Sequence, residues 1–168
     1  GIDPGRVTLA GESGGGNLSI ATTMRLRSTD ELGLIRGLYA LCPYIAGEWP
    51  LPRHPSSTEN NGILLSLHGN RPRMAYGIEA FEAKDPMAWP SFATVDDVAG
   101  FPKTMISVNE CDPLRDEGIE FYRQLLEAGV AARCRQVMGT MHGVEVFPLV
   151  CTEISRDTAR DLAAFAKD

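Results

Sequence analysis

The sequence lacks long apolar runs and has few basic residues. No run approaches the roughly 18 consecutive apolar residues that a membrane-spanning helix needs. The 16 Lys and Arg residues are outnumbered by 22 Asp and Glu residues, which leaves a net charge of −6. Nucleic acids and anionic membranes both favour basic patches. The first residues also lack the basic start and apolar core of a signal peptide. We therefore expect no nucleic-acid partner and no membrane partner.

Cysteine is scarce, and its spacing matches no common pattern. The chain has four cysteines, with neither a Cys-x-x-Cys pair nor the spacing of a zinc site: Cys42, Cys111, Cys134 and Cys151. Each has apolar or strand-like neighbours, so we interpret them as free, mostly buried thiols, with a disulfide pair as the alternative. Free thiols favour a reducing compartment, and we therefore expect a cytoplasmic protein.

Strand-like and helix-like segments alternate along the 168 residues, which is a length typical of one domain. The segments predicted as strands are Val7–Ala10, Ile35–Leu41, Thr104–Asn109 and Ala132–Val137. Those predicted as helices are Asn17–Arg27, Glu117–Ala128 and a final helix within Leu149–Ala166. This alternation predicts parallel βαβ units and an α/β fold.

The segment from Tyr44 to about Gly100 interrupts the alternation. It contains six prolines and the turn signal Asn60-Asn61-Gly62, and we expect a short helix near Ser66–Phe81. It is too long for an ordinary connection, and such excursions usually carry function or form a lid. We therefore interpret residues 44–100 as a partly cap-like excursion.

Ser13 lies in a glycine-rich junction, Gly11–Gly16, between the first predicted strand and the first predicted helix. A Gly-x-Ser-x-Gly pattern at such a junction favours a nucleophile elbow, in which a tight, strained turn projects the serine Oγ above the sheet. Gly11 and Gly15 are expected to give the room that strand and helix need as they pass. The backbone N–H of Gly14 is then the candidate donor of an oxyanion hole.

Other functions of this turn remain as alternatives. A glycine-rich turn that binds a dinucleotide needs glycine in place of Ser13 and an acid at the end of the next strand, which reads Leu41-Cys42-Pro43 instead. A phosphate-binding P-loop needs a Gly-Lys-Ser/Thr sequence, which does not follow here. A tight structural turn with an idle serine stays open. We expect Glu12 to be buried and to anchor the turn by hydrogen bonds, without a catalytic role.

A serine nucleophile needs a base and an acid that orients the base, and in this fold they follow in the order Ser, acid, His. Of the three histidines, only His142 follows the fourth predicted strand, in a loop before the last helix. His54 and His68 precede the third strand and break the order. We therefore predict His142 as the base, with a surface-loop histidine as the alternative.

The acid is expected just after the third predicted strand, where Asp112 lies. Pro113 follows it and is suited to the start of a helix. Glu110 is a rival that is almost within the strand. Asp116 is a second rival, although acids are common in a first helical turn because of the helix dipole. We predict that Asp112 orients His142.

Taken together, the three motifs resemble the hormone-sensitive-lipase family of esterases. The typical elbow of that family, Gly-Asp-Ser-Ala-Gly-Gly, corresponds to Gly11–Gly16, and its Asp-Pro-Leu-x-Asp-Glu motif matches Asp112–Glu117. Its His-Gly-Phe motif matches His142-Gly143-Val144, with valine for phenylalanine. The branch that contains bacterial brefeldin A esterase also shares the segments Asp85–Pro90 and Asn109–Gly118. The likeness extends over essentially the whole chain.

The resemblance implies an α/β-hydrolase fold and a serine carboxylesterase that forms an acyl-enzyme. The implied substrate is a small ester with a short acyl chain, and lactones stay open. The resemblance also implies no metal, no organic cofactor and a homodimer, often formed through the last strand and helix. Two alternatives remain: a non-catalytic hydrolase-fold fragment that serves as a binding or assembly module, and an amidase or peptidase with the same triad.

The family also carries an upstream His-Gly-Gly-Gly loop that supplies further oxyanion donors, and these 168 residues contain no such motif. We therefore expect residues 1–168 to be the C-terminal part of one α/β-hydrolase domain, with the elbow strand as an unpaired edge. The N-terminal half, from the same gene or a separate chain, is the expected partner. Because loss of one oxyanion donor costs roughly 10²–10³ in rate, we expect this chain alone to be a weak or inactive enzyme.

Overall fold

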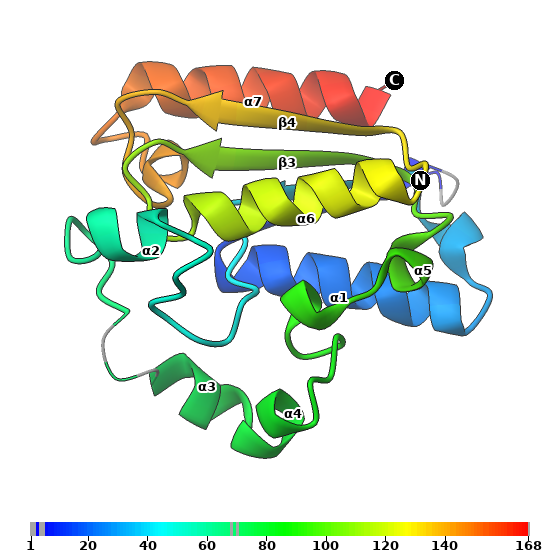
Figure 1. The fold of residues 1–168 in the computed structure, drawn as a ribbon. Coiled ribbons are helices and arrows are strands. Elements are labelled where there is room, and N and C mark those ends of the chain that lie inside the picture. Colours follow the sequence, from blue (N-terminus) through cyan, green and yellow to red (C-terminus); the bar gives the residue numbers. More distant parts are fainter. Residues whose placement is uncertain (1–2, 4–5, 68, 70, 168) are drawn as a thin grey trace.

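The computed structural model describes residues 3, 6–67, 69 and 71–167. Its centre is a four-stranded parallel sheet in the order β1-β2-β3-β4 (Figure 1). The strands are β1 (Thr8–Glu12), β2 (Gly37–Leu41), β3 (Lys103–Asn109) and β4 (Ala132–Val137). The predicted α/β class with parallel strands is therefore confirmed, and the carboxyl ends of all four strands lie at one edge.

Helices cover both faces of this sheet (Figure 1). Helices α1 (Gly14–Ser28) and α6 (Arg115–Glu127) pack on one face, where they share a core with β2 and β3: Ile20, Leu38, Ile106, Val108, Phe121 and Leu125. Helix α7 (Thr152–Lys167) packs on the other face through Phe165, against Tyr39, Leu41 and Met105. Every residue of β2 is buried, because a central parallel strand is covered from both sides.

The helix boundaries differ from the sequence-based expectation in three places: at the start of α1, at the start of α6, which is Arg115 instead of Glu117, and within residues 66–81. Helix α1 begins at Gly14 instead of Asn17, so the glycine run lies within the helix although glycine is a poor helix former. The last helix begins at Thr152, within the segment where it was expected, and Leu149 before it is 99 % exposed. The helix expected at 66–81 is instead α3 (Arg71–Tyr76) and α4 (Ile78–Glu82), separated at Gly77. His68 lies outside the described residues.

The excursion at 44–100 lies on the outer side of α1 and α6 (Figure 1). It packs around aromatic side chains of its own. It contains α3 and α4 and the short elements α2 (Ser56–Glu59), η4 (Pro90–Phe92) and α5 (Val95–Val98). Its core residues are Ala46, Trp49, Leu67, Ala88 and Trp89, together with Leu114. The remaining short elements of the fold are η2 (Leu32–Leu34) and η5 (Val144–Val146).

A buried carboxyl group joins the excursion to α6. Glu117 Oε1 accepts hydrogen bonds from the backbone N–H groups of Ile45 at 2.7 Å and Ala46 at 3.2 Å. Glu117 Oε2 accepts one from Trp49 Nε1 at 2.6 Å. Burial raises the pKa of Glu117 to about 8, although these donors favour its ionised form. The start of the excursion is therefore tied to the helix that packs on the sheet.

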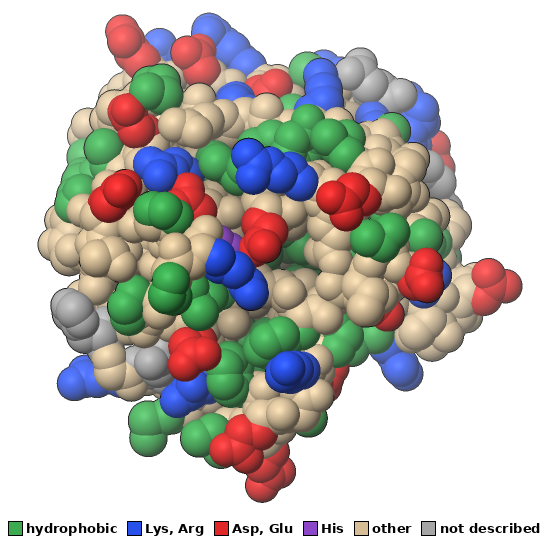
Figure 2. Space-filling model, in the orientation of Figure 1, with side chains coloured by type: hydrophobic (Ala, Val, Ile, Leu, Met, Phe, Trp, Pro, Cys, Tyr) green, Lys and Arg blue, Asp and Glu red, His purple; other side chains and the backbone are tan. Residues whose placement is uncertain are grey.

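The thiols and the surface complete this description. All four cysteines are free, but only Cys42 is buried and the other three are half-buried, so the expectation of mostly buried thiols is only partly correct. None of the described helices is long and apolar enough to cross a membrane. On the face shown in Figure 2, acidic and basic side chains are interspersed among apolar and neutral ones. The cytoplasmic location stays a prediction.

Candidate active site

Ser13 lies on a strained turn between β1 and α1. Its backbone has φ 55° and ψ −118°, a conformation that side-chain-bearing residues rarely adopt. The Ser13 N–H donates to the Leu41 carbonyl at 2.9 Å, and the Ser13 carbonyl accepts from Asn17 N and Tyr44 N, both at 3.1 Å. The end of β2 and the start of the excursion therefore hold the turn in place.

The glycines of this turn differ in what they do. A Cβ on Gly11 would lie 2.1 Å from the Gly15 carbonyl oxygen, so the expected need for glycine at this position is confirmed. A Cβ on Gly15 would meet no atom within 4 Å, so the same expectation for Gly15 is wrong. Gly16 is the second crowded position, because its Cβ would lie 3.0 Å from Pro43 Cα. The helix therefore passes close to β1 at Gly11 and close to the end of β2 at Gly16.

The structure brings Ser13, His142 and Asp112 together at the carboxyl edge of the sheet. His142 Nε2 lies 2.9 Å from Ser13 Oγ, and His142 Nδ1 lies 2.9 Å from Asp112 Oδ2. The Asp112 side chain is 0 % exposed, and its Oδ1 accepts a hydrogen bond from Leu114 N at 2.9 Å. The three residues follow β1, β4 and β3 respectively, as the chain order predicts. This arrangement permits a proton to pass between serine and imidazole.

The rival acids and the other described histidine have different partners. Glu110 Oε2 accepts from Gly139 N at 2.7 Å and so supports the loop that carries His142. Asp116 Oδ2 accepts from Ser56 N at 2.7 Å, which helps to hold the excursion. His54 is buried, and its Nε2 lies 2.5 Å from Glu120 Oε2.

Carboxylates surround the imidazole of His142. Burial alone would lower the pKa of His142, but the hydrogen bond and charge of Asp112, followed by the charges of Glu12 and Glu145, outweigh it and raise the pKa above its usual value. These charges stabilise the protonated ring, which is the form a general base reaches after it takes a proton.

Sequence reasoning missed the buried partners behind the triad. Glu145 is 3 % exposed, and its Oε2 accepts a hydrogen bond from Asn109 Nδ2 at 2.7 Å. The same amide donates to the Met141 carbonyl at 2.6 Å, next to His142. The only sequence signal for Glu145 is its position three residues after His142, and no motif that we weighed includes it.

Cys42 adds a possible metal ligand to this cluster. Ligand atoms of Cys42, Asp112 and His142 all lie within 4.8 Å of one another. A cysteine ligand must be a thiolate, yet burial, reinforced by the charges of nearby carboxylates, raises the pKa of Cys42 well above its usual value. Asp112 and His142 are also hydrogen-bonded to each other. The chemistry of this donor set therefore favours a proton relay over a metal site.

A small apolar cavity of about 260 Å³ adjoins the elbow. It is lined by Gly14 and Asn17 from α1, by Tyr44 and Trp89 from the excursion, and by Tyr76 from α3. Gly14 is exposed and begins α1, where backbone N–H groups have no partner within the helix. The candidate oxyanion donor and an apolar pocket thus lie together.

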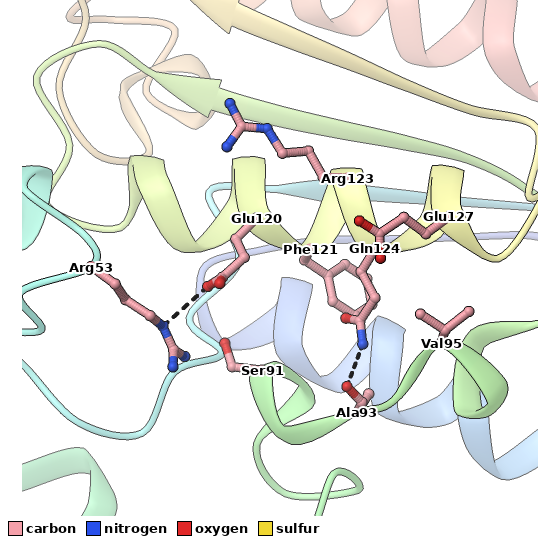
Figure 3. A pocket seen from close by; sticks show the side chains of 9 residues that line it. All are labelled: Arg53, Ser91, Ala93, Val95, Glu120, Phe121, Arg123, Gln124 and Glu127. Carbon is pink, nitrogen blue, oxygen red and sulfur yellow. Dashed lines mark hydrogen bonds and ion pairs between the residues drawn. The ribbon is translucent and has the colours of Figure 1, made fainter.

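A larger hollow of about 450 Å³ lies between α6 and the segment at 91–95, away from the triad (Figure 3). Arg53 Nε and Glu120 Oε2 at its rim are 3.2 Å apart, and Gln124 donates to the Ala93 carbonyl. The lining contains no triad residue, and these polar groups satisfy one another. We therefore do not choose this hollow as the candidate site, although it is larger than the cavity beside Gly14.

Comparison with known proteins identifies the family of the chain. A family model described as alpha/beta hydrolase fold matches residues 1–146. Carboxylesterase NlhH of Mycobacterium tuberculosis is 29 % identical over 170 residues, which cover 99 % of this chain and 52 % of NlhH. The structure of esterase Est22 is similar with a TM-score of 0.97 at 64 % identity, over 99 % of this chain and 49 % of Est22.

Brefeldin A esterase, described as a bacterial homologue of human hormone sensitive lipase, has a TM-score of 0.90 at 43 % identity. The match covers 95 % of this chain and 46 % of that protein. The chain thus spans about half the length of the relatives that it matches. The resemblance to hormone-sensitive-lipase esterases that the motifs indicate is confirmed, and the chain belongs to the alpha/beta hydrolase fold family.

Proposed function

We propose that this protein is a carboxylic ester hydrolase with Ser13 as nucleophile, His142 as general base and Asp112 as the orienting acid. The observation that carries the proposal is the pair of 2.9 Å contacts that links the three side chains in this order. The relatives named carboxylesterase and esterase support the choice of esters. The strained backbone of Ser13 supports its role as the nucleophile of an elbow turn.

The proposed reaction passes through an acyl-enzyme. Ser13 Oγ attacks the ester carbonyl while its proton moves to His142 Nε2, and the carbonyl electrons move onto the oxygen, to which the Gly14 N–H donates. Collapse of this intermediate expels the alkoxide, which takes the proton from His142. Water then attacks the acyl-enzyme by the same path, releases the acid and restores Ser13. Asp112 holds the imidazole with its Nδ1 proton toward the carboxylate.

The cavity beside Gly14 supports small substrates. Its volume of about 260 Å³ is below the range of about 300–1,000 Å³ typical of drug-sized ligands. Tyr44, Tyr76 and Trp89 make its wall apolar and aromatic. We therefore propose short acyl esters as the substrate class. Lactones belong to the same proposal, because the chemistry at a lactone carbonyl is identical and only the alcohol stays attached.

We further propose that residues 1–168 form the C-terminal part of one hydrolase domain that is completed by an N-terminal half. Two features support this: β1 pairs only with β2 among the described strands, and an apolar groove lined by Leu18, Leu26 and Met87 lies beside α1. A homodimer through β4 and α7 is a separate proposal, supported by the exposed Leu149 and Val150. Sedimentation of the full-length protein and of its Leu149→Asp variant tests the dimer.

Labelling with a fluorophosphonate probe tests the catalytic proposal. We expect the full-length protein to be labelled on Ser13 and to hydrolyse p-nitrophenyl acetate and butyrate, and Ser13→Ala to lose both properties. If the full-length protein is not labelled, the alternative of a non-catalytic binding module stands. If p-nitroanilides are cleaved as fast as the matching esters, an amidase or peptidase replaces the esterase. Full turnover by residues 1–168 alone would contradict the need for the other half.

A further inference from the structure

The carboxylate of Glu12 lies beside the reacting nitrogen of His142. Glu12 Oε1 is 3.3 Å from His142 Nε2, the same atom that lies 2.9 Å from Ser13 Oγ. The Glu12 side chain is 26 % exposed, and that of His142 is 11 % exposed. The sequence predicted that Glu12 is buried and anchors the turn by hydrogen bonds, but the residue is only half-buried. Its position instead gives Nε2 two oxygen neighbours from adjacent residues of the elbow.

Gly143, which follows His142, has no side chain and so leaves room for the same carboxylate. A Cβ on Gly143 would lie 2.5 Å from Glu12 Oε1 and 3.1 Å from Glu12 Cδ. Gly143 also has φ 62°, in the left-handed region where glycine is favoured. The His-Gly pair and the Gly-Glu-Ser turn are therefore complementary in shape, which places Glu12 against the histidine loop.

Each charge around the imidazole acts from a different element. Asp112 faces Nδ1 from the loop after β3, Glu145 lies in η5, and Glu12 ends β1. The Cys42 thiol lies nearby after β2, and its raised pKa favours the neutral form. Burial raises the pKa of Glu12, the charge of His142 lowers it, and the charges of Glu145 and Asp112 raise it further. Asp112 and Glu12 thus face opposite nitrogens of one ring.

We propose that Glu12 is a positioning residue for the reaction, because its carboxylate stabilises His142 only after Nε2 has taken the proton of Ser13. In the resting state Nε2 carries a lone pair and faces a second acceptor in Glu12, which is unfavourable. Once the proton moves from Ser13 Oγ to Nε2, the new N–H lies between the Ser13 oxygen and Glu12 Oε1 and can donate to both.

This difference between the two states favours catalysis, because an interaction that appears only as the transition state is approached lowers the barrier. Glu12 keeps its charge throughout, and the proton continues from Nε2 to the departing alkoxide. The inference rests on the proposed function of Ser13 and His142, and it adds a second carboxylate on the opposite side of the ring from Asp112.

The test is the pH profile of kcat/KM for p-nitrophenyl acetate in the full-length protein and in Glu12→Gln, which keeps the shape of the side chain. Loss of the charge lowers the pKa of His142, so the acid limb should move to lower pH by roughly 0.5–1 unit. The plateau should nevertheless fall roughly tenfold, because the protonated ring is less stabilised in the transition state. Glu12→Asp, which keeps the charge at a greater distance, should lie between the two.

A change that only loosened the turn would lower the plateau and leave the acid limb in place. Glu31→Gln is the matched control, because Glu31 is an exposed glutamate just before η2, at the opposite edge of the sheet from the triad. It should leave both the limb and the plateau unchanged. If the limb of Glu12→Gln coincides with that of the unaltered protein, the proposal is wrong.

An NMR titration separates this inference from the proposed function. The ¹⁵N imidazole signals of His142, assigned by their loss in His142→Gln, should titrate at lower pH in Glu12→Gln whether or not the protein turns over esters. An unchanged titration would overturn the role of Glu12. A shifted titration in a protein that fluorophosphonate does not label would retain the contact between Glu12 and His142 and reject the esterase.

Discussion

The two polar clusters of the molecule are built in opposite ways. At the carboxyl edge of the sheet, His142 lies among three carboxylates and stays partly exposed. Under the excursion, Glu117 is fully buried and accepts hydrogen bonds from three N–H donors, those of the Ile45 and Ala46 backbone and of the Trp49 indole. The first cluster brings together charges that favour a protonated ring, whereas in the second a carboxyl group accepts hydrogen bonds from two backbone N–H groups and one indole N–H.

Under the proposed function, carboxyl groups therefore have two uses in this protein: they support a reaction at the sheet edge, and they hold a segment in place beneath the excursion. A carboxylate that serves chemistry faces a group whose charge changes during the reaction. A carboxylate that serves attachment faces groups that never change their charge. Substitutions should therefore affect rate in the first region and stability in the second.

The largest effect is expected at the elbow. Ser13→Ala should lower kcat/KM for p-nitrophenyl acetate by roughly 10⁴-fold or more, because no nucleophile remains. Adding His142→Ala to this variant should cost little more, since the two residues act as one unit. Urea unfolding of both variants should match the unaltered protein. If the second substitution lowered kcat/KM by as large a factor again as the first, the two residues would not act in a shared step.

The next largest loss of activity is expected at Asp112, and the same substitution at Asp116 is the matched comparison. Asp112→Asn should lower kcat by roughly 10³–10⁴-fold, because an amide does not fix the imidazole tautomer or stabilise its charge. Asp116→Asn, four residues later, should leave kcat within about twofold, because Asp116 holds Ser56 and Arg115 and not His142. Equal losses in the two variants would reject the assignment of Asp112.

The activity of the unaltered protein should rise with pH as His142 loses its proton. Because the pKa of His142 is raised above its usual value, the midpoint of the acid limb of kcat/KM should lie above about 6.5. The pH profile of p-nitrophenyl acetate hydrolysis measures this midpoint. A midpoint well below that value would mean that burial, and not the charge of the surrounding carboxylates, determines the pKa of His142.

In the second region, stability should depend on pH through Glu117. Its pKa is about 8 in the folded state and near 4.5 when exposed, so between these values the folded state binds more protons than the unfolded state. The contribution of Glu117 is therefore fully present below pH 4.5 and is lost as pH rises through 8. Urea unfolding at a series of pH values should show this decline.

Glu117→Gln should flatten that pH dependence and, at pH 5, should lower the free energy of unfolding by about 1–3 kcal/mol, because one N–H donor loses its acceptor. Glu127→Gln, an exposed glutamate in the same helix, is the control and should change neither property. Limited proteolysis within 44–100 should quicken only in Glu117→Gln. Identical pH dependence in both variants would exclude Glu117 as its source.

The smallest effects are expected for two glycine substitutions, which distinguish the cost of backbone strain from that of a contact with Glu12. Gly143→Ala and Gly129→Ala both place alanine at a positive φ, and each should cost about 1–2 kcal/mol of stability. Only the Cβ at 143 meets another residue, Glu12, whereas the Cβ at 129 meets no atom within 4 Å. We therefore expect Gly143→Ala alone to change the pH profile of kcat/KM. Equal profiles would show that Glu12 moves aside freely.

Much of the fold could be predicted because its signals are local. The strands at Thr104–Asn109 and Ala132–Val137 are apolar or alternating segments next to clear turn signals, and their predicted bounds are within one residue of those observed. The excursion was harder. Gly77 divides the expected single helix there, and Trp49 is hydrogen-bonded to Glu117 in a helix that is distant in sequence. Short helices have few internal bonds, so tertiary contacts decide where they form.

The three candidate residues, Ser13, Asp112 and His142, could be found from the sequence, because each stands in a local motif and the fold constrains their order along the chain. The packed structure was needed to show that Glu12 faces His142 and that Gly16, instead of Gly15, is the second crowded glycine beside Gly11. Ser13 and His142 are 129 residues apart, and their contact forms when the sheet aligns the loops after β1 and β4. Contacts of this kind depend on the shape of the packed chain, which no local pattern encodes.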